Sequence, residues 1–546
     1  RDRFSLSNGF LGVDIFFVIS GFLITTLILR GLAGESFSFA DFYLRRARRL
    51  LPALYATLFV VTAAAYLFLT TRQWGDYLDQ LLGAVTFTSN MVLPYQVGYF
   101  DDAAETRPLL HIWSLSLEEQ YYFFMPALLV LCAVRWRGLL MLVLGAASFA
   151  LCMYLVSASV EFAELEGPDL AFYMFPSRAW ELLAGSLLAW WMLRRADFRV
   201  VPYLKWTALT GLLLLLVFPL DTEHPGGDAL IAVALTALLI AGRDDWLPAW
   251  KPVNWIERVG DWSYSLYLIH WPLLAFAYVA YLGVVPENVR GALVVLALVL
   301  SWLQYRFIET PFRKPGPSRS RAVWSLLGAT ACVLVLAVPA ATVSWGLRDA
   351  GGPDFEEIRR LNAGLHGVCR LKPPYRIPGR CKTVRDPKVA VWGDSFAMHL
   401  IPGLRENPAI DDSIIQLTRS GCNPAKQLVP IITGLTRARQ CRDFNARALG
   451  FITSNPSLEY VILGSPFGYF FDHGKGVLLG NDVVPYTHDR VVDDVLAAIT
   501  AIQSSGKTVL IVSPPPHGGF DVGECIERRA TGAVILGLSL IHISEP

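Results

Sequence analysis

Residues 12–24 read GVDIFFVISGFLI, an apolar run that contains a single carboxylate, Asp14, near its start. A helix of about 20 such residues is long enough to cross the hydrocarbon core of a bilayer. The chain repeats this pattern, and we predict ten membrane-spanning helices, near residues 10–30, 50–70, 113–133, 138–157, 171–193, 204–220, 228–242, 263–283, 291–308 and 322–346. The sequence therefore predicts a multi-span α-helical membrane domain over residues 1–346, with the lipid bilayer as its partner.

Basic residues set the expected orientation of these helices, because short loops rich in Lys and Arg stay in the cytoplasm. An eleventh apolar stretch, residues 78–94, contains Asp79 and Asn90. If this stretch lies on the outer face of the membrane, or enters that face without crossing, all the arginine-rich loops lie in the cytoplasm. The acidic loops then lie on the opposite side of the membrane. We then expect a multi-pass protein of a bacterial inner membrane, with the chain after residue 346 outside the cytoplasm.

Composition supports this class and argues against nucleic acid as a partner. Hydrophobic residues make up 54% of the chain and charged residues 17%, as expected for a membrane protein. The net charge of +1 is too small to create a positive electrostatic field that attracts nucleic acid. Cysteine placement fits an oxidising compartment for the second part of the chain. There we expect local disulfides such as Cys369 with Cys381 and Cys422 with Cys441, which leaves Cys525 over; reduced buried thiols are the alternative.

Four arginines, Arg45, Arg46, Arg48 and Arg49, stand within five residues at the expected cytoplasmic start of a helix. Guanidinium groups bind phosphate oxygens through paired hydrogen bonds and stay charged. The pattern therefore predicts a phosphate-binding site. The alternative is a topology signal that also anchors lipid headgroups.

The stretch HIWSLSLEEQYY begins another expected span at residue 111. At helical spacing, His111, Ser114 and Glu118 share one face, so we expect a titratable imidazole and a carboxylate to converge there. The alternative is a polar helix start at the membrane interface, flanked by aromatic anchors.

Three further ionisable residues lie within the expected spans, where such groups are costly and are candidates for function. They are Asp14, His270 and, at the end of a span, Glu309. Gly12 and Gly21, on either side of the Asp14 region, permit close helix approach, which is also the structural explanation for both glycines.

These strings resemble the acyltransferase-3 family of membrane O-acyltransferases over residues 9–315, where they occur in the family order: GVDIFFVISGFLIT, FYLRRARRLLP, HIWSLSLEEQYY, YSLYLIHWP and ETP. The resemblance implies transfer of an acyl group, usually acetyl from acetyl-CoA, to a sugar hydroxyl outside the cytoplasm. It implies that Arg45, Arg46 and Arg49 handle the acyl donor and that Glu309 belongs to a functional glutamate-proline motif. The family's catalytic histidine is expected in a helix before residue 1.

Residues 347–388 are rich in proline, glycine and charge and are predicted to be a linker into a domain at 389–546. A buried strand ends at Trp392, and Gly393, Asp394 and Ser395 follow at a strand-to-helix turn. Alternating strands and helices then predict a three-layer α/β domain. A serine at a helix N-terminus is well placed as a nucleophile, since backbone N–H groups there stabilise an oxyanion.

This second part resembles the SGNH hydrolase superfamily, which implies Ser395 as nucleophile, with Asp394 beside it and Gly421 as a second oxyanion donor. Two blocks of that superfamily depart from expectation: residues 464–467 read GSPF without an asparagine, and no Asp-x-x-His follows. His399 and His517 are weak substitutes for the missing base. We expect a fragment, incomplete at both ends and inactive as written.

The sequence as a whole predicts a membrane O-acyltransferase that moves an acyl group from cytoplasmic acyl-CoA to a hydroxyl of a cell-surface polysaccharide. The proposed catalytic residues are Ser395, Asp394, Glu309, His111 and Glu118. No permanently bound cofactor and no metal are expected; acetyl-CoA is the expected donor. A transporter or flippase of an acyl or glycan lipid, and a membrane-tethered esterase, are the alternatives. The acceptor glycan and the acyl chain length stay open.

Overall fold

The structure is a computed structural model of the 546-residue chain. It describes residues 8–96, 104–157, 160–162, 165–195, 198–218, 220, 224–242, 257–283, 285–313, 319–344, 355, 362–410, 412–431, 435–467, 476–512 and 522–536. The chain forms two compact units: a helical unit, Arg1–Phe355 with Asp521–Pro546, and an α/β unit, Glu356–Phe520. Each unit is described by itself.

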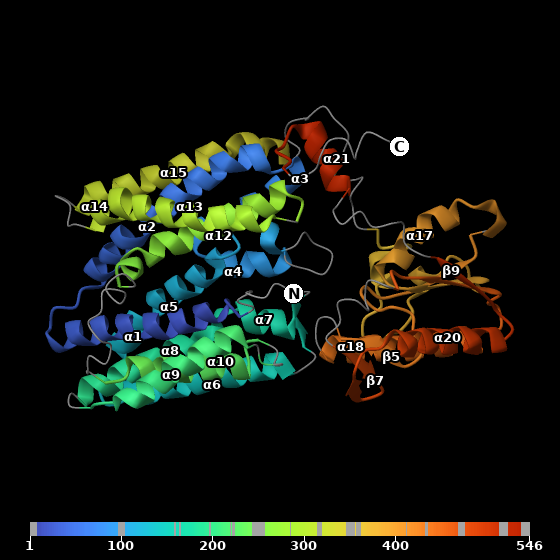
Figure 1. Cartoon of the computed structure of the whole chain (residues 1–546), viewed down its shortest axis with the longest axis horizontal. Helices are drawn as coiled ribbons and strands as arrows, with labels where there is room; N and C mark the ends of the chain where they lie inside the picture. Colours follow the sequence, from blue (N-terminus) through green and yellow to red (C-terminus); the bar gives the residue numbers. More distant parts are fainter. Residues whose placement is uncertain are drawn as a thin grey trace. The chain divides into compact units, whose positions relative to one another are not determined.

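A helix occupies each of the ten expected spans, and Figure 1 shows the long helices of this unit running beside one another. The long helices are α1 (Leu11–Ala33), α2 (Phe39–Phe68), α5 (Ile112–Leu131), α6 (Arg137–Ser157), α8 (Phe175–Arg194), α9 (Pro202–Val217), α10 (Gly227–Ile240), α12 (Ser263–Ala280), α13 (Glu287–Gln304) and α15 (Arg319–Ser344). The expected helical membrane architecture is confirmed.

Shorter elements complete the helical unit. They are α3 (Thr71–Thr86), α4 (Ser89–Val92), η1 (Leu93–Tyr95), η2 (Ala104–Thr106), β1 (Glu161–Phe162), β2 (Leu165–Glu166), α7 (Gly167–Tyr173), the π-helical turn η3 (Tyr305–Glu309), α14 (Thr310–Arg313) and α21 (Val522–Thr531). The eleventh apolar stretch is divided between α3, α4 and η1, because the chain turns at Phe87, which has a φ of 56°. It is therefore not one continuous helix.

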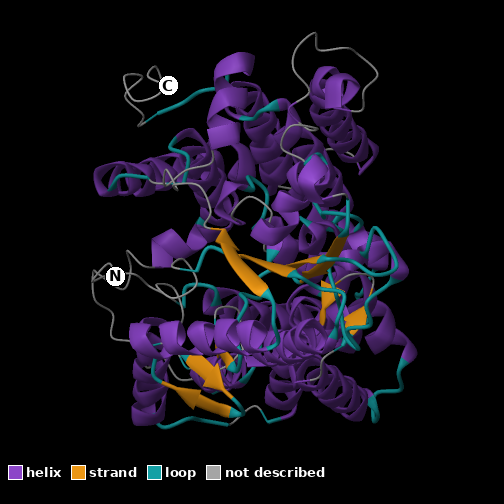
Figure 2. Cartoon of the chain, turned by 90° about the vertical axis from the view of Figure 1, so that its right-hand side faces the viewer, coloured by secondary structure: helices purple, strands orange, loops and turns teal. Residues whose placement is uncertain are grey.

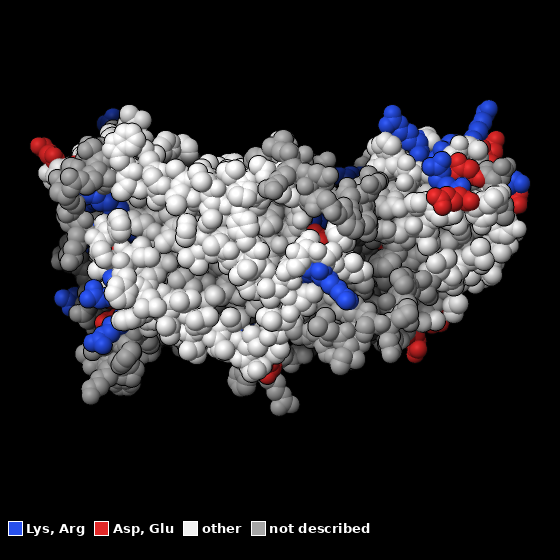
Figure 3. Space-filling model, turned by 90° about the horizontal axis from the view of Figure 1, so that it is seen from above, with Lys and Arg blue, Asp and Glu red and all other residues white. Residues whose placement is uncertain are grey.

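Among the described residues, five helices are long and apolar enough to cross a membrane by length and composition: Leu11–Ala33, Phe39–Phe68, Arg137–Ser157, Glu287–Arg313 and Val323–Ser344. Helices α5, α8 and α12 are not among them, although they have 20, 20 and 18 residues. Each of these three helices carries ionisable side chains, among them Glu118, Arg178 and His270. Figure 3 shows a broad white surface along this unit, with Lys and Arg side chains gathered at one end.

Helices α1 and α8 pack at backbone distance through two glycines. A Cβ atom added to Gly21 would lie 1.9 Å from the carbonyl oxygen of Leu182, and one added to Gly185 would lie 2.0 Å from that of Val18. The expectation of close approach is thus confirmed for Gly21. It is wrong for Gly12, where an added Cβ would meet nothing within 4 Å.

The α/β unit is built on a parallel sheet with helices on both faces (Figure 1). Its strands β3 (Val389–Gly393), β4 (Ile414–Thr418), β6 (Tyr460–Gly464) and β9 (Thr508–Val512) follow the order β4-β3-β6-β9. A second, antiparallel sheet has the order β5-β7-β8, with β5 (Leu428–Pro430), β7 (Val477–Leu479) and β8 (Asp482–Val484); Figure 2 shows the two sheets as separate groups of orange strands. The helices are α17 (Ser395–Arg405), α18 (Leu435–Ser454) and α20 (His488–Ser504), with the short turns η4 (Gly367–Cys369), η5 (Gly379–Cys381) and η6 (Pro408–Ile410).

Strand β3 places alternate side chains in two different cores, as the period of two in a strand requires. Ala390 and Trp392 join the core that includes α18 and α20, whereas Val389 and Val391 join the core with α17. The expected three-layer α/β arrangement is confirmed. It places the carboxyl ends of β3, β4 and β6, and the loops that follow them, at one edge of the sheet.

The described part of the expected linker, residues 362–388, belongs to the α/β unit. Its Cys369–Cys381 disulfide closes a small loop, and Leu371 donates a backbone hydrogen bond of 3.0 Å to Thr418 at the end of β4. The proline and glycine content of this segment thus marks a disulfide-closed extension of the domain. The second expected disulfide, Cys422–Cys441, is also present.

Candidate functional site

The arginines at the start of α2 meet acidic residues of α5 inside the helical unit. The Arg46 guanidinium lies 3.4 Å from the Glu119 carboxylate, and its carbon atom lies 3.4 Å from the centre of the Tyr122 ring. Arg49, one helical turn further along, lies in electrostatic range of Glu118 and of the end of α13. Arg45 is exposed to the surroundings.

Glu309 reaches the same region from a distant part of the sequence. It lies at the end of η3, and a π-helical turn inserts one extra residue per turn and so re-aims the side chains that follow. The Glu309 carboxylate is fully buried, accepts a 2.8 Å hydrogen bond from Ser265 of α12 and lies 2.7 Å from Arg313. Arg49 and Arg313 flank it electrostatically.

Glu118 completes this group, which we call the arginine–glutamate cluster: Arg46, Arg49, Glu118, Glu119, Glu309 and Arg313. Glu118 is buried and accepts a hydrogen bond from Ser20 of α1. Side chains from α1, α2, α5, α12 and the α13–α14 segment therefore meet at one place. The structure brings together Arg46, Arg49, Glu118 and Glu309 of the expected site. Sequence reasoning missed Ser20, Ser265, Tyr122 and Arg313, which lack a distinctive signal.

His111 does not meet Glu118. The His111 ring is buried and packs against the His270 ring, with 5.8 Å between the ring centres. The Tyr267 ring packs against both histidine rings, and its hydroxyl bonds to the Ser114 hydroxyl at 2.7 Å and to the His111 carbonyl. His111 and Glu118 are two helical turns apart, about 10 Å along α5, so they contact different neighbours.

The His111–His270 pair is a second group of candidate residues. His270 places its Nδ1 atom 2.9 Å from the Tyr267 carbonyl, an arrangement in which Nδ1 carries the hydrogen. Neither ring nitrogen of His111 makes a well-aligned hydrogen bond to a described residue. Imidazole is the side chain that most often serves as a general acid or base in catalysis. Asp14 lies in a third place, 3.2 Å from Arg178 of α8.

In the α/β unit, Ser395 is the first residue of α17, and one residue, Asp394, separates it from the end of β3. Asp394 caps this helix: its Oδ1 accepts a 2.9 Å hydrogen bond from the Phe396 amide, and its Oδ2 accepts a 2.6 Å bond from the Ser465 hydroxyl. Both carboxylate oxygens thus accept hydrogen bonds that fix the turn from which Ser395 follows. Burial raises the pKa of Asp394 to about 7, although both hydrogen bonds favour the ionised form.

Gly421 follows β4 at the same edge of the sheet and has a φ of 70°, a left-handed conformation that glycine adopts without strain. The Cys422–Cys441 disulfide holds the next residue.

His399, one turn after Ser395, is exposed, and no hydrogen bond joins it to Ser395 among the described residues. His517 lies outside the described residues. Ser465, within the GSPF sequence, is the functional contact that sequence reasoning missed.

A helical membrane unit with a buried arginine–glutamate cluster, followed by an α/β unit with a serine at a strand end, defines a two-part membrane protein of the fused acyltransferase class. The acyltransferase domain family matches residues 2–345, and the SGNH domain that is fused to such domains matches residues 356–541. The chain belongs to this acyltransferase domain family.

Several curated proteins resemble the membrane part. The peptidoglycan O-acetyltransferase OatA of Listeria monocytogenes is 32% identical over 343 residues, 57% of this chain and 52% of that protein. A Bacillus subtilis protein, YrhL, whose name describes a peptidoglycan O-acetyltransferase, is 32% identical over 57% of this chain and 51% of its own length. A Staphylococcus aureus protein named as an O-acetyltransferase is 32% identical over 57% of this chain and 54% of its own. The chain spans about half the length of the curated relatives it matches. No solved structure matches it.

Proposed function

We propose that this chain is part of a membrane O-acyltransferase that moves an acyl group, acetyl in the simplest case, from cytoplasmic acyl-CoA to a hydroxyl of an extracytoplasmic cell-surface polysaccharide. The observation that carries this proposal is the arginine–glutamate cluster, in which five segments of a family-matched membrane unit meet. Glu118 and Glu309 are buried there beside arginines at a helix end. Buried charge in a membrane unit is costly and argues for function.

The donor fits the arginines of this cluster. Coenzyme A carries phosphate groups, and the fork of a guanidinium matches phosphate oxygens better than an ammonium does. Arg49 is exposed and Arg313 is about one-third exposed, so both can meet a ligand from outside the bundle. Without a ligand, an ion pair with Glu119 holds Arg46 in place, and an ion pair with Glu309 holds Arg313.

The acceptor side of the reaction needs a base and an acyl-accepting or acyl-directing group. His111 and His270 offer imidazole nitrogens for proton transfer. In the α/β unit, Ser395 offers a hydroxyl at a helix N-terminus, where backbone amides favour an oxyanion. The names of the Listeria and Bacillus relatives favour peptidoglycan as the acceptor among cell-surface polysaccharides.

The proposed location is a bacterial inner membrane, with the α/β unit outside the cytoplasm. Two disulfides in that unit support this orientation, because disulfides persist in oxidising compartments. The arginines at the start of α2 support it too, since basic loops stay in the cytoplasm.

Coenzyme A binding tests the donor site on the chain as it stands. The purified full chain is titrated with coenzyme A by calorimetry, and the double variant R46A/R49A is compared with it. We expect the double variant to raise the Kd about 100-fold or more, since each charge-assisted hydrogen bond contributes about 1.5–3 kcal/mol.

Arg135, an exposed arginine between α5 and α6, is the matched control, and R135A should keep the Kd of the unaltered chain. Equal Kd values for R46A/R49A and R135A would overturn the assignment of the donor site.

A further inference from the structure

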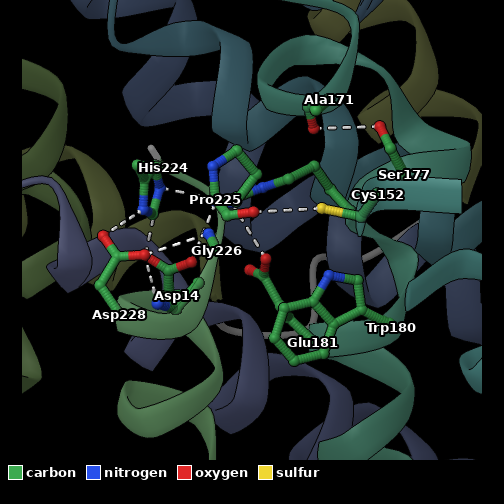
Figure 4. A network of polar contacts seen from close by, with 12 residues as sticks. Asp14, Cys152, Ala171, Ser177, Trp180, Glu181, His224, Pro225, Gly226 and Asp228 are labelled. Atoms are coloured by element: carbon green, nitrogen blue, oxygen red, sulfur yellow. Dashed lines mark hydrogen bonds and ion pairs between the residues drawn. The ribbon is translucent and has the colours of Figure 1, made fainter. Parts of the chain in front are cut away.

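A third group of buried ionisable side chains lies where α1, α8 and the start of α10 meet. Asp14, Arg178 and Glu181 have side chains that are 0–1% exposed. His224 and Asp228 join them from the chain that enters α10. Figure 4 shows Asp14, His224 and Asp228 pointing toward one another, with Glu181 beside them. The proposed reaction uses none of these groups.

The Arg178 guanidinium lies between two carboxyl groups. Its Nη2 is 3.2 Å from Asp14 Oδ1 and its Nη1 is 3.1 Å from Glu181 Oε1. The guanidinium is also surrounded by aromatic rings, 5.6 to 5.8 Å from the ring centres of Phe17, Trp113 and Phe172. This surrounding excludes water, so each charge must be balanced within the cluster.

The charges do not balance when all carboxyl groups are ionised. Among the residues that the structure describes here, three carboxylates face one guanidinium, and even a protonated His224 leaves one negative charge in excess. Asp14 and Glu181 contact the two terminal nitrogens of the same guanidinium, so their carboxyl groups lie close to each other. Carboxyl groups in such contact cannot both ionise and share one proton instead. Cys152 of α6 faces the same cluster as a thiol and adds no cation.

His224 connects this carboxyl pair to the surface. Its Nδ1 lies 2.9 Å from Asp228 Oδ2, and its side chain is 11% exposed. Its Nε2 lies 3.4 Å from Nη1 of Arg178 and 3.8 Å from Asp14 Oδ2. Asp228 is fixed by the amides of Gly226 and Ala229, at 3.1 and 2.8 Å. An imidazole between two carboxyl groups, at the edge of a buried cluster, has the geometry of a proton shuttle.

We propose that Asp14 and Glu181 together bind one proton, and that this proton exchanges with the surface of the helical unit through His224. Arg178 holds both carboxyl groups in place and does not itself exchange a proton.

The role of this site rests on the proposed function. Acylation breaks the O–H bond of the acceptor, forms a bond between that oxygen and the acyl carbon, and releases the donor sulfur as a thiolate. One proton is thereby set free from the hydroxyl. The proton of the hydroxyl joins the Asp14–Glu181 pair as the pair gives its own proton to the surface through His224, so the pair holds one proton before and after the reaction.

Infrared spectroscopy of the full chain in nanodiscs, without any acyl-CoA, tests the proton site. The C=O stretch of a protonated carboxyl group is recorded at neutral pH for the unaltered chain, for D14N and E181Q, and for E287Q, which changes an exposed glutamate at the start of α13. All chains in this comparison also carry D394N, because Asp394 would give a protonated-carboxyl band of its own at neutral pH. We expect D14N and E181Q each to remove the same component of the remaining band, and E287Q to keep that component. The proposal is overturned if D14N or E181Q leaves the band unchanged.

H224Q provides a second measurement that leaves both carboxyl groups in place. The band should persist, but its shift on transfer into D₂O should slow by about 100-fold, the usual contribution of a positioned acid–base group. Unchanged exchange would overturn the role of His224. H488Q, at an exposed histidine of the α/β unit, is the control.

The catalytic role is measured separately, as ester-linked acetate on the polysaccharide of cells that express the complete reading frame. H224Q should lower that acetate about 100-fold. If the infrared result holds but the unaltered protein transfers no acetyl group, the proton site stands and the proposed function fails. If the unaltered protein transfers acetyl and H224Q does so equally well, the role of the site in the reaction fails.

Discussion

At the scale of single residues, Asp394 holds the turn at the start of α17 in place. It is buried at the start of α17, and both its oxygens accept hydrogen bonds that fix the turn carrying Ser395. Burial raises its pKa to about 7, whereas an aspartate in an unfolded chain has a pKa of about 3.9. The folded chain therefore binds this proton more tightly than the unfolded chain does.

This difference predicts a pH dependence of stability. Protonated Asp394 adds on the order of 4 kcal/mol to the free energy of unfolding. This contribution is fully present below about pH 4 and is lost as the pH rises to about 7. Hydrogen exchange of peptides from β3 and β6, corrected for the intrinsic rate, measures it in the full chain. D394N should remove this pH dependence, because asparagine does not titrate and can still cap the helix. The same dependence in D394N would contradict the explanation.

Sequence and structure agree at some residues and differ at others for a physical reason. Arg46, Glu118 and Glu309 could be singled out because charged groups in apolar helices are rare and costly. The contacts of Asp14 could not be predicted, because Arg178 and His224 come from distant helices and each also has an ordinary explanation in the sequence. Ser465 gave no signal, since a buried serine is common in any core.

At the scale of elements, the helix pair α1 and α8 holds much of the helical unit together. The two helices touch through Gly21 and Gly185, and the same pair carries Asp14 and Arg178. Close approach is therefore a condition for the ion pair. The ten helices could be predicted from long apolar runs, whereas their pairing depends on small residues whose partners the sequence does not mark.

A single methyl group at this contact should be strongly destabilising. In G21A the added Cβ would lie 1.9 Å from the Leu182 carbonyl, so the helices must separate, and we expect a loss of about 2–3 kcal/mol, as for overpacked cores. G12A is the control, since its Cβ meets nothing, and it should be neutral or stabilise the helix by about 1 kcal/mol. Thermal unfolding in detergent measures both variants; equal melting temperatures would show that the contact is looser than described.

At the scale of the whole molecule, the chain joins a helical membrane unit to an α/β unit with two disulfides. The sequence predicted both parts because their patterns differ so strongly, long apolar runs in one and short buried strands in the other. It placed residues 362–388 in a linker, because proline and glycine content does not distinguish a linker from a loop closed by a disulfide.

The state of the cysteines tests the orientation of the two units. The chain has eight cysteines, and two disulfides leave four free thiols, Cys132, Cys152, Cys332 and Cys525. Alkylation of the denatured, unreduced protein from membranes should therefore label four cysteines by mass spectrometry. Eight labelled cysteines would place the α/β unit in a reducing compartment and contradict the proposed orientation.

We propose that the arginine–glutamate cluster holds the donor for acyl transfer to a cell-surface polysaccharide. The most direct test is the amount of ester-linked acetate on that polysaccharide in cells that express the complete reading frame, unaltered or with R46A/R49A or R135A. We predict that acetate rises with the unaltered protein and with R135A, and is lower by about 100-fold with R46A/R49A. Equal acetate with R46A/R49A, or no rise with the unaltered protein, would contradict the claim.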